Sequence, residues 1–537
     1  MLSFIKSDSH SRCTAYKRVR GTRTCVHNLP LDRHLELTDM APRTRSYEPL
    51  PPSDPVLRQQ LGSLRSAIVR KPPFCQGLAP LAVDDLVLFY GKGPITRRIN
   101  LLNASAEELQ HLAETCDPAT FGVDQQDVYD ETYRKAGKLD RTDFALANFS
   151  PDAVGILDEV RNELLIEGLE KSERIHAELY KLNVYGPGSF FKAHVDTPRS
   201  ERMFGSLVIV FPTAHEGGEL VLRQEKEDSD DSNTEDSEDP KQEDSEDTEM
   251  KDSSGPHKDE WTFDSSALLS SAAQTESSIP TSAPVAYVAF YSDVEHEVLP
   301  VRSGYRVTIT YNLYYEQDSA SASGGGSVVP RSVPPNEQTF QSTFKALLDD
   351  PTFLPTGGNL LFTFLHQYPL PRGSKASKAA LKDVGFRLKG SDAVIMKVVQ
   401  EFHLNATLGI VYQDVPEYGD VNYVLCDEVV SLEGEEVWSE SLCEFLLEDS
   451  DAVVLNPNPR WAKMYRRTAQ VHWIATAPWR FNSNKETFVA HGNEATLSHT
   501  YWRISMLVRV GAAGSRTVAV ENVETPEAQW SDTEYSD

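Results

Sequence analysis

Cysteine is scarce in this sequence, and long apolar runs are absent. Six cysteines are spread over 537 residues and none forms a CxxC pair. We therefore expect neither a disulfide framework nor a structural zinc site, and a reducing compartment fits best. No run of 18 apolar residues occurs, so we expect no membrane span.

The first 30 residues lack the apolar segment of a secretory signal and contain one acidic residue, Asp8. We therefore expect an intracellular protein of the cytoplasm or nucleus, with mitochondrial targeting as a minor alternative. Met40 opens an equally plausible start, so whether residues 1–39 belong to the mature protein stays open.

Basic residues are also few relative to acidic ones. The sequence has 52 Lys and Arg against 81 Asp and Glu, a net charge of -29. Such a balance disfavours nucleic-acid partners and electrostatic docking on anionic lipid. The charge is partly local, because residues 224–260 hold 17 acidic residues against 4 Lys and so contribute -13.

Composition divides the chain into several segments, because its length exceeds that of one ordinary core. The acidic run cannot bury enough apolar surface to order itself, and Gly324–Gly326 mark a flexible connection. We predict a disordered N-terminal segment 1–55, a helical region 56–170 packing on the following domain, a β domain 171–318 with a disordered insertion 224–260, a linker 319–336, a C-terminal α+β domain 337–517 and a disordered acidic tail 518–537.

The predicted fold class is α+β, mainly β. Ser105 and Glu108 form a capping box at the start of one helical pattern. From residue 175 to 315 the sequence instead shows short apolar runs separated by Gly and Pro turns, which is typical of an antiparallel sandwich or barrel, and a jelly roll fits the spacing. In the C-terminal domain, residues 359–364, 407–412, 421–430, 470–475 and 501–510 predict strands, and residues 391–402 predict a helix.

His194 and Asp196 follow one predicted strand and are two residues apart. Side chains at positions i and i+2 of a strand point the same way, so both can reach one metal ion. Non-haem iron sites use two imidazoles and one carboxylate and keep positions open for cosubstrate and dioxygen. His296, beyond the predicted strand 285–291, is the candidate third ligand.

Arg306 lies ten residues after His296 and opens the next predicted strand. A guanidinium there can bind the distal carboxylate of 2-oxoglutarate as a bidentate pair, and Thr308 on the same strand face can add a hydroxyl. An HxD pair alone has little specificity, since a second one, His257 and Asp259, occurs by accident in the acidic run, where no strand is predicted to orient it.

Three stretches together resemble the prolyl 4-hydroxylase-type branch of the 2-oxoglutarate/Fe(II) oxygenases. These stretches are Tyr180 to Asp196, Gly217 to Leu220, and His296 to Arg306, within a match over about residues 175–315. The usual interval between HxD and the distal histidine is about 50–70 residues in that branch. Here it is 102 positions, and removing the 37-residue acidic run leaves 65.

The resemblance implies a double-stranded β-helix (jelly roll) with His194, Asp196 and His296 as iron ligands and Arg306 as the 2-oxoglutarate anchor. Tyr185 matches a position that often contacts the cosubstrate. The implied reaction consumes 2-oxoglutarate and O2, hydroxylates a C–H bond and releases succinate and CO2, with ascorbate as a candidate reductant.

One departure concerns the substrate. Collagen-type prolyl hydroxylases have Lys at the position of Arg306, so the cosubstrate inference holds while a prolyl substrate stays open. The leading hypothesis is a protein residue, with proline as one candidate. The alternatives are a small molecule or modified nucleotide, or a catalytically silent binding module.

The C-terminal domain has no HxD pair among its histidines, and we predict that it is non-catalytic. A degenerate repeat of the β-helix or a docking scaffold are the alternatives for it. The sequence leaves the oligomeric state open.

Overall fold

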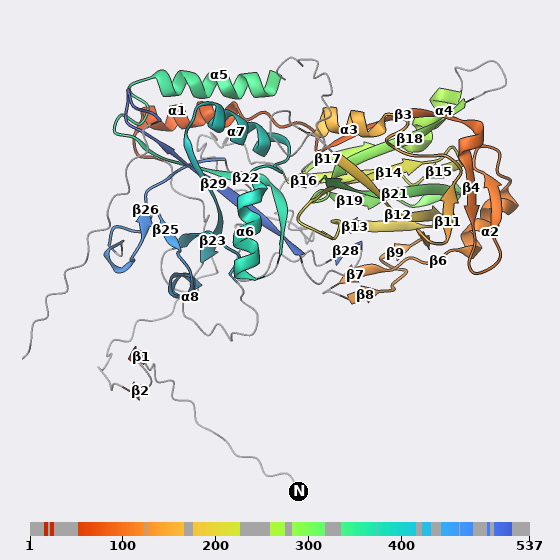
Figure 1. Cartoon of the computed structure of the whole chain (residues 1–537), viewed down its shortest axis with the longest axis horizontal. Coiled ribbons are helices and arrows are strands. Elements are labelled where there is room, and N and C mark those ends of the chain that lie inside the picture. Colours follow the sequence, from red (N-terminus) through yellow and green to blue (C-terminus); the bar gives the residue numbers. More distant parts are fainter. Residues whose placement is uncertain are drawn as a thin grey trace, which may run out of the picture. The chain divides into compact units, whose positions relative to one another are not determined.

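The computed structural model describes residues 16–19, 22–25, 52–123, 126–165, 175–225, 258–273, 282–316, 335–371, 373–414, 421–430, 442–460, 462–475, 491–493 and 499–517. These residues form a strand-rich mixture of helices and sheets (Figure 1). None of the described helices is both long and apolar enough to cross a lipid bilayer. Residues 319–334 of the predicted linker 319–336 and the tail 518–537 lie outside the described residues, whereas residues 335 and 336 begin a helix, so the predicted linker is too long at its end.

Contacts divide the chain into two compact units, residues 1–47 and 48–537. The first unit contains β1 (Tyr16–Val19) and β2 (Thr22–Cys25), which pair antiparallel across a two-residue connection. The prediction of disorder throughout residues 1–55 is therefore wrong for these strands. Their Tyr, Val and Thr residues favour extended backbone, a preference that the abundant polar residues concealed.

A seven-stranded antiparallel sheet forms the first half of a central region, residues 74–315. Its inner strands are long and apolar, and Leu207, Ile209 and Val288 are fully buried. In spatial order the strands are β3 (Phe74–Ala82), β18 (Ser282–Tyr291), β14 (Met203–Val210), β21 (Arg306–Tyr315), β12 (Ile175–Tyr185), β10 (Gly137–Asp140) and β6 (Asp117–Pro118).

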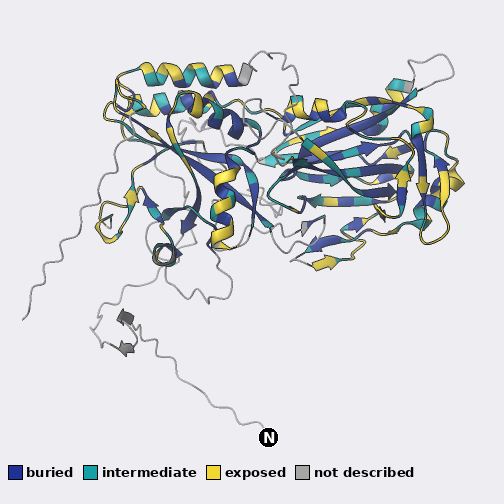
Figure 2. Ribbon diagram, in the orientation of Figure 1, coloured by how far each residue is buried: buried dark blue, intermediate teal, exposed yellow. Residues whose placement is uncertain are grey.

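A five-stranded antiparallel sheet forms the second half. Leu222, Phe263 and Val298 from this sheet belong to the same hydrophobic cluster as the apolar residues of the seven-stranded sheet, and the strands of both are largely buried in Figure 2. Its order is β17 (Lys258–Phe263), β16 (Leu220–Glu225), β19 (Glu295–Val298), β13 (Phe190–His194) and β9 (Arg134–Lys135).

Residues 56–170 were predicted to be helical, and the structure corrects this. The region has helices α2 (Ala106–Thr115) and α3 (Ile156–Leu164), but it also supplies β3, β6 and β10 to one sheet and β9 to the other. These strands are edge or near-edge strands, in which half-exposed polar residues weaken the apolar alternation that sequence reading relies on. The capping box at Ser105 and Glu108 is confirmed.

Helix α1 (Pro55–Ser66) also differs from its predicted packing. Its Leu61 and Leu64 lie in the hydrophobic cluster of the C-terminal region, together with Phe340 and Phe353. An amphipathic pattern specifies that a helix has an apolar face but not which core that face covers.

Smaller elements complete the central region. Gly217 and Gly218 have positive φ angles, as the predicted turn requires. The remaining elements are the sheet β11 (Phe144–Leu146), β4 (Val87–Tyr90) and β5 (Arg97–Asn100), the pair β15 (His215–Gly217) and β20 (Val301–Gly304), the 3-10 helix η1 (Val83–Leu86) and helix α4 (Ser265–Ala273).

The acidic insertion begins and ends in a β-hairpin. Glu225 at the end of β16 pairs with Lys258 at the start of β17, and Lys258 also binds Glu295 at 2.8 Å. The predicted disordered range 224–260 is therefore wrong at both ends, and Asp259 lies on a strand. Residues 226–257, including His257, lie outside the described residues.

The hairpin predicts the effect of removing the acidic run. Because Glu225 and Lys258 are cross-strand partners, a short Asn-Gly turn can join them without changing the register. We expect deletion of residues 226–257 to leave the affinity for Mn(II), measured by titration, within about twofold of that of the full chain. The hydrogen bonds described for His194, Asp196 and His296 come from residues that the deletion leaves in place, and only the loss of such a bond would cost roughly tenfold or more. A deletion variant that is folded but binds no metal contradicts this prediction.

The C-terminal region, residues 335–517, contains another seven-stranded sheet. The strands predicted at 407–412, 421–430, 470–475 and 501–510 and the helix predicted at 391–402 are confirmed within a few residues at their ends, while the strand predicted at 359–364 continues to Pro371. Two helices, residues 374–384 and 390–401, contact this sheet. The sheet order is β26 (Thr468–Ala469), β25 (Val453–Leu455), β24 (Asn422–Cys426), β23 (Asn405–Asp414), β29 (His499–Val510), β22 (Gly358–Pro371) and β27 (His472–Ala475). The helices are α5 (Pro335–Asp349), α6 (Ser374–Val384), α7 (Gly390–Glu401), α8 (Leu442–Asp449) and the 3-10 helix η2 (Ala462–Met464).

One strand crosses between the regions. Strand β28 (His491–Gly492) lies between β27 and β29 in sequence, yet it pairs with β7 (Phe121–Val123), which pairs in turn with β8 (Gln126–Val128). Gly492 also forms an isolated bridge with Val195, between His194 and Asp196. A C-terminal segment thus reaches the chain next to the predicted metal ligands.

The turn between β18 and β19 makes a second, charged contact with the C-terminal region. Asp293 in this turn accepts hydrogen bonds from Lys389 Nζ at 2.8 Å and from the backbone N–H of Gln367 at 2.9 Å, and it contacts His366 Nδ1 at 3.0 Å. The side chains of Asp293, Lys389 and His366 are at most 5% exposed. This buried network therefore ties the turn that leads into His296 to the C-terminal sheet and helix.

Candidate metal centre

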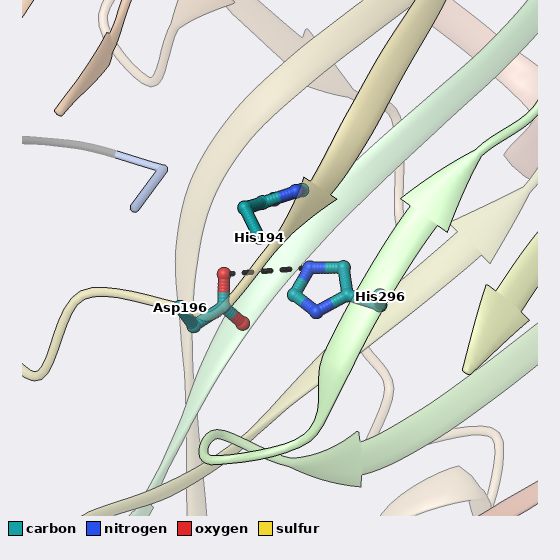
Figure 3. Close-up of side chains that lie close together, drawn as sticks. All are labelled: His194, Asp196 and His296. Atoms are coloured by element: carbon teal, nitrogen blue, oxygen red, sulfur yellow. Dashed lines mark ion pairs between the residues drawn. The ribbon is translucent and has the colours of Figure 1, made fainter. Parts of the chain in front are cut away.

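His194, Asp196 and His296 come together in the central region. His194 ends β13, His296 lies on β19, and the two residues are direct cross-strand partners. Their side chains and that of Asp196 point toward one another (Figure 3), and one potential ligand atom of each lies within 4.8 Å of the others. Among the described residues this is the only group of three such side chains, and all three are buried.

Hydrogen bonds orient both imidazoles. His194 Nδ1 lies 2.9 Å from the carbonyl oxygen of Lys192, and His296 Nδ1 lies 3.0 Å from that of Val294. A carbonyl can only accept, so both Nδ1 atoms carry hydrogen, and Nε2 is the nitrogen that each ring can present to a metal. His296 Nε2 is 3.7 Å from Asp196 Oδ1.

The surroundings of His194 favour its neutral form. Burial lowers its pKa well below the usual value, and the neighbouring His296 lowers the pKa further. The ring of Phe191 stacks on His194 with centroids 3.6 Å apart, and the guanidinium of Arg134 lies 4.2 Å from the centroid on Phe191. Phe191 therefore belongs to the hydrophobic core and also borders the cavity of the site.

Both carboxylate oxygens of Asp196 are held by neutral donors. The hydroxyl of Ser206 on β14 donates to Oδ2, and the side-chain amide of Asn493 donates to Oδ1 at 2.8 Å. Sequence reasoning missed both residues. Ser206 is signalled only as a polar residue within an apolar strand, and Asn493 has no local signal at all.

Arg306 lies on β21 of the facing sheet and is 1% exposed. Its Nε and Nη2 have no hydrogen-bond partner within the part of the chain that the structure describes. Burial lowers its pKa, although Tyr185 and Glu219 act in the opposite direction. A buried guanidinium with unpaired N–H groups is costly unless an anion binds it.

Gly218 makes room for this side chain. A Cβ atom at Gly218 would approach Arg306 Cδ to 2.8 Å, a distance that real Cβ atoms essentially never show. The Gly217-Gly218 pair thus serves two purposes, since it supplies positive φ angles and leaves the arginine in place.

Tyr185 and Thr308 line the same cavity as Arg306, His194, Asp196 and His296. Tyr185 is the cross-strand partner of Arg306, and the arginine lies 5.6 Å from the centroid of its ring. Thr308 faces Asn183, whose carbonyl accepts from the Thr308 hydroxyl at 3.5 Å. All six predicted site residues therefore border one cavity. A larger cavity of about 690 Å³ beside α4 and β15 contains none of them.

The donor set fits a non-haem iron centre. Two imidazoles with free Nε2 atoms and one carboxylate are the ligands that such iron sites use. The unpaired edge of Arg306 in the same cavity fits the far carboxylate of a dicarboxylate cosubstrate.

Comparison with known proteins gives the family. Residues 180–314 match the family model of the 2OG-Fe(II) oxygenase superfamily. The matched residues include the three clustered side chains together with Tyr185, Arg306 and Thr308. No curated protein matches the chain.

Three solved structures are similar to the chain at low identity. A prolyl-4-hydroxylase of Pseudomonas putida is 18% identical, covers 48% of this chain and 99% of its own, and has a TM-score of 0.25. A 2OG-Fe(II) oxygenase family oxidoreductase of Burkholderia pseudomallei is 14% identical, with 51% and 97% covered and a TM-score of 0.18. A Trichoplax adhaerens prolyl hydroxylase, in complex with a hypoxia inducible factor oxygen degradation domain peptide fragment, is 13% identical, with 48% and 92% covered and a TM-score of 0.22.

Proposed function

We propose that this protein is a 2-oxoglutarate- and Fe(II)-dependent dioxygenase that hydroxylates a C–H bond of a protein residue, with proline as one candidate. The convergence of His194, Asp196 and His296 on one point, beside an unpaired buried arginine, carries the proposal. In this function the two sheets of the central region are the halves of a double-stranded β-helix. Substrate oxidation is coupled to conversion of 2-oxoglutarate and O2 into succinate and CO2.

Each residue has a distinct role in the proposed site. His194 and His296 present their Nε2 atoms to Fe(II), and Asp196 presents a carboxylate oxygen. Bound iron supplies the oxidative chemistry. Arg306 neutralises the far carboxylate of 2-oxoglutarate, while Tyr185 and Thr308 border that end of the cavity and restrict its position.

The protein substrate rests on the resemblance of the segment from Tyr180 to Asp196 to the prolyl 4-hydroxylase-type branch. A small molecule or a modified nucleotide is the competing substrate class, and a silent binding module is the competing non-enzymatic function.

Succinate formation tests the enzyme class. We expect purified protein with Fe(II), 2-oxoglutarate and ascorbate to form succinate without added substrate, and chelation of iron to stop it.

Arg306→Gln removes the buried cation, and its loss is expected to cost roughly 2–4 kcal/mol of cosubstrate binding, a factor of about 30 to 800 in Kd. Titration of 2-oxoglutarate into the Mn(II)-loaded protein measures this change.

Arg302→Gln is the matched control, because Arg302 lies on β20 shortly before Arg306, its side chain is 65% exposed, and its ion pair with Glu219 is long at 3.4 Å. Its affinity for 2-oxoglutarate should equal that of the wild type. An unchanged affinity in Arg306→Gln contradicts the anchor, and a metal-loaded chain that never forms succinate favours the silent module. Mass spectrometry of proteins and metabolites that gain one oxygen atom separates the substrate classes.

A further inference from the structure

The side chain of Asn493 bridges two neighbouring groups of the metal-binding segment. Its Nδ2 donates to Asp196 Oδ1 at 2.8 Å, and its Oδ1 accepts from the backbone N–H of Thr197 at 3.0 Å. The second bond fixes the orientation of the amide, because only Oδ1 can accept from an N–H. The first bond is then necessarily a donation to the carboxylate.

Each oxygen of the Asp196 carboxylate accepts a hydrogen bond from a side chain. Ser206 donates to Oδ2 from the seven-stranded sheet, while Asn493 donates to Oδ1 from the C-terminal region. Carboxylate torsions are intrinsically broad, and Asp196 follows the last residue of β13 rather than lying within the strand. Its orientation therefore depends on donors outside its own strand.

The position of Asn493 is itself determined by strand pairing. The preceding residue, Gly492, pairs with Gly122 of β7 and forms the bridge with Val195. These backbone contacts place residue 493 beside Asp196 although the two are 297 residues apart in sequence. Asn493 also lines the cavity that contains His194, His296 and Arg306.

From this geometry we propose that Asn493 is a positioning residue of the metal centre, through which the C-terminal region completes the site. The amide directs one oxygen of Asp196 toward the point where His194 and His296 converge. The inference rests on the proposed function, and it changes the predicted role of the C-terminal domain from a non-catalytic attachment to a supplier of one contact of the site.

Metal titration of the full chain tests the proposal. Losing one hydrogen-bonding partner of a metal ligand typically lowers metal affinity by roughly 10- to 100-fold, and we expect that loss for Mn(II) in Asn493→Ala. We also expect the visible absorption spectrum of the Co(II)-loaded variant to change, because the carboxylate geometry changes. Asn493→Ser, too short to bridge both partners, should behave in the same way.

The control is Asn148→Ala, which removes an Asn–Asp hydrogen bond of 3.3 Å between Asn148 and Asp85 at an exposed position. Its Mn(II) affinity and Co(II) spectrum should match those of the wild type. If Asn493 served only to attach the C-terminal segment, thermal stability would fall while metal affinity and spectrum stayed the same, and this result overturns the proposal. A wild-type chain that binds no metal contradicts the iron centre itself, and the positioning role with it.

Discussion

Replacing His194 by alanine is expected to abolish both metal binding and succinate formation. The variant keeps only His296 and Asp196 of the three clustered ligands, and it also loses the stacking partner of Phe191. Because losing a mere supporting contact costs about 10- to 100-fold in metal affinity, loss of a ligand should exceed about 100-fold. Mn(II) titration and a succinate assay measure the two effects separately.

His176→Ala provides the control for this substitution. His176 is exposed on β12 of the same region, so its replacement removes an imidazole of equal size without reaching the cavity. We expect wild-type metal affinity and wild-type succinate formation. Retention of wild-type metal affinity in His194→Ala, with the fold intact, would contradict the assigned ligand set.

Replacing Asp293 by asparagine is expected to lower the free energy of unfolding by about 3–5 kcal/mol, because it leaves Lys389 buried without its counter-ion. Both side chains of this pair are at most 5% exposed. Asparagine has the same shape as aspartate, so the change removes charge rather than packing. The shift of the chemical denaturation midpoint, followed by circular dichroism, measures the loss.

Asp349→Asn is the matched control, since the Lys345–Asp349 pair on α5 has side chains 63% and 66% exposed. Exposed pairs contribute about 0–1 kcal/mol, so the midpoint should barely move. The double substitution of Asp293→Asn with Lys389→Met should cost less than Asp293→Asn alone, because it no longer buries an uncompensated charge. Equal midpoints for Asp293→Asn and the wild type would exclude a stabilising role for the network.

The same pair makes stability depend on pH. Burial by itself raises the pKa of Asp293, but Lys389 and His366 outweigh it and hold the pKa well below the usual value. A depressed folded-state pKa contributes stability at neutral pH, which is lost as pH falls below the unfolded value of about 4. Asp293→Asn should therefore unfold with a weaker pH dependence below that value than the wild type.

The local sequence determined the chemistry of this protein. The two-residue periodicity of strands predicted that His194 and Asp196 face the same way, and Arg306 opens the strand that pairs with Tyr185. Short-range rules of this kind also located the capping box at Ser105 and the strands of the C-terminal sheet. They require only neighbouring residues, so one sequence is sufficient to apply them.

Tertiary structure alone decided the surroundings of that chemistry. Asn493 reaches Asp196, Lys389 reaches Asp293, and α1 covers the C-terminal core. The edge strand β3 and the hairpin that encloses the acidic run were likewise not predicted from the sequence. Each depends on contacts between segments far apart in the chain, whose partners are selected by the packing of the whole fold rather than by any local pattern. The sequence therefore predicted the three clustered side chains, and the fold decided what surrounds them.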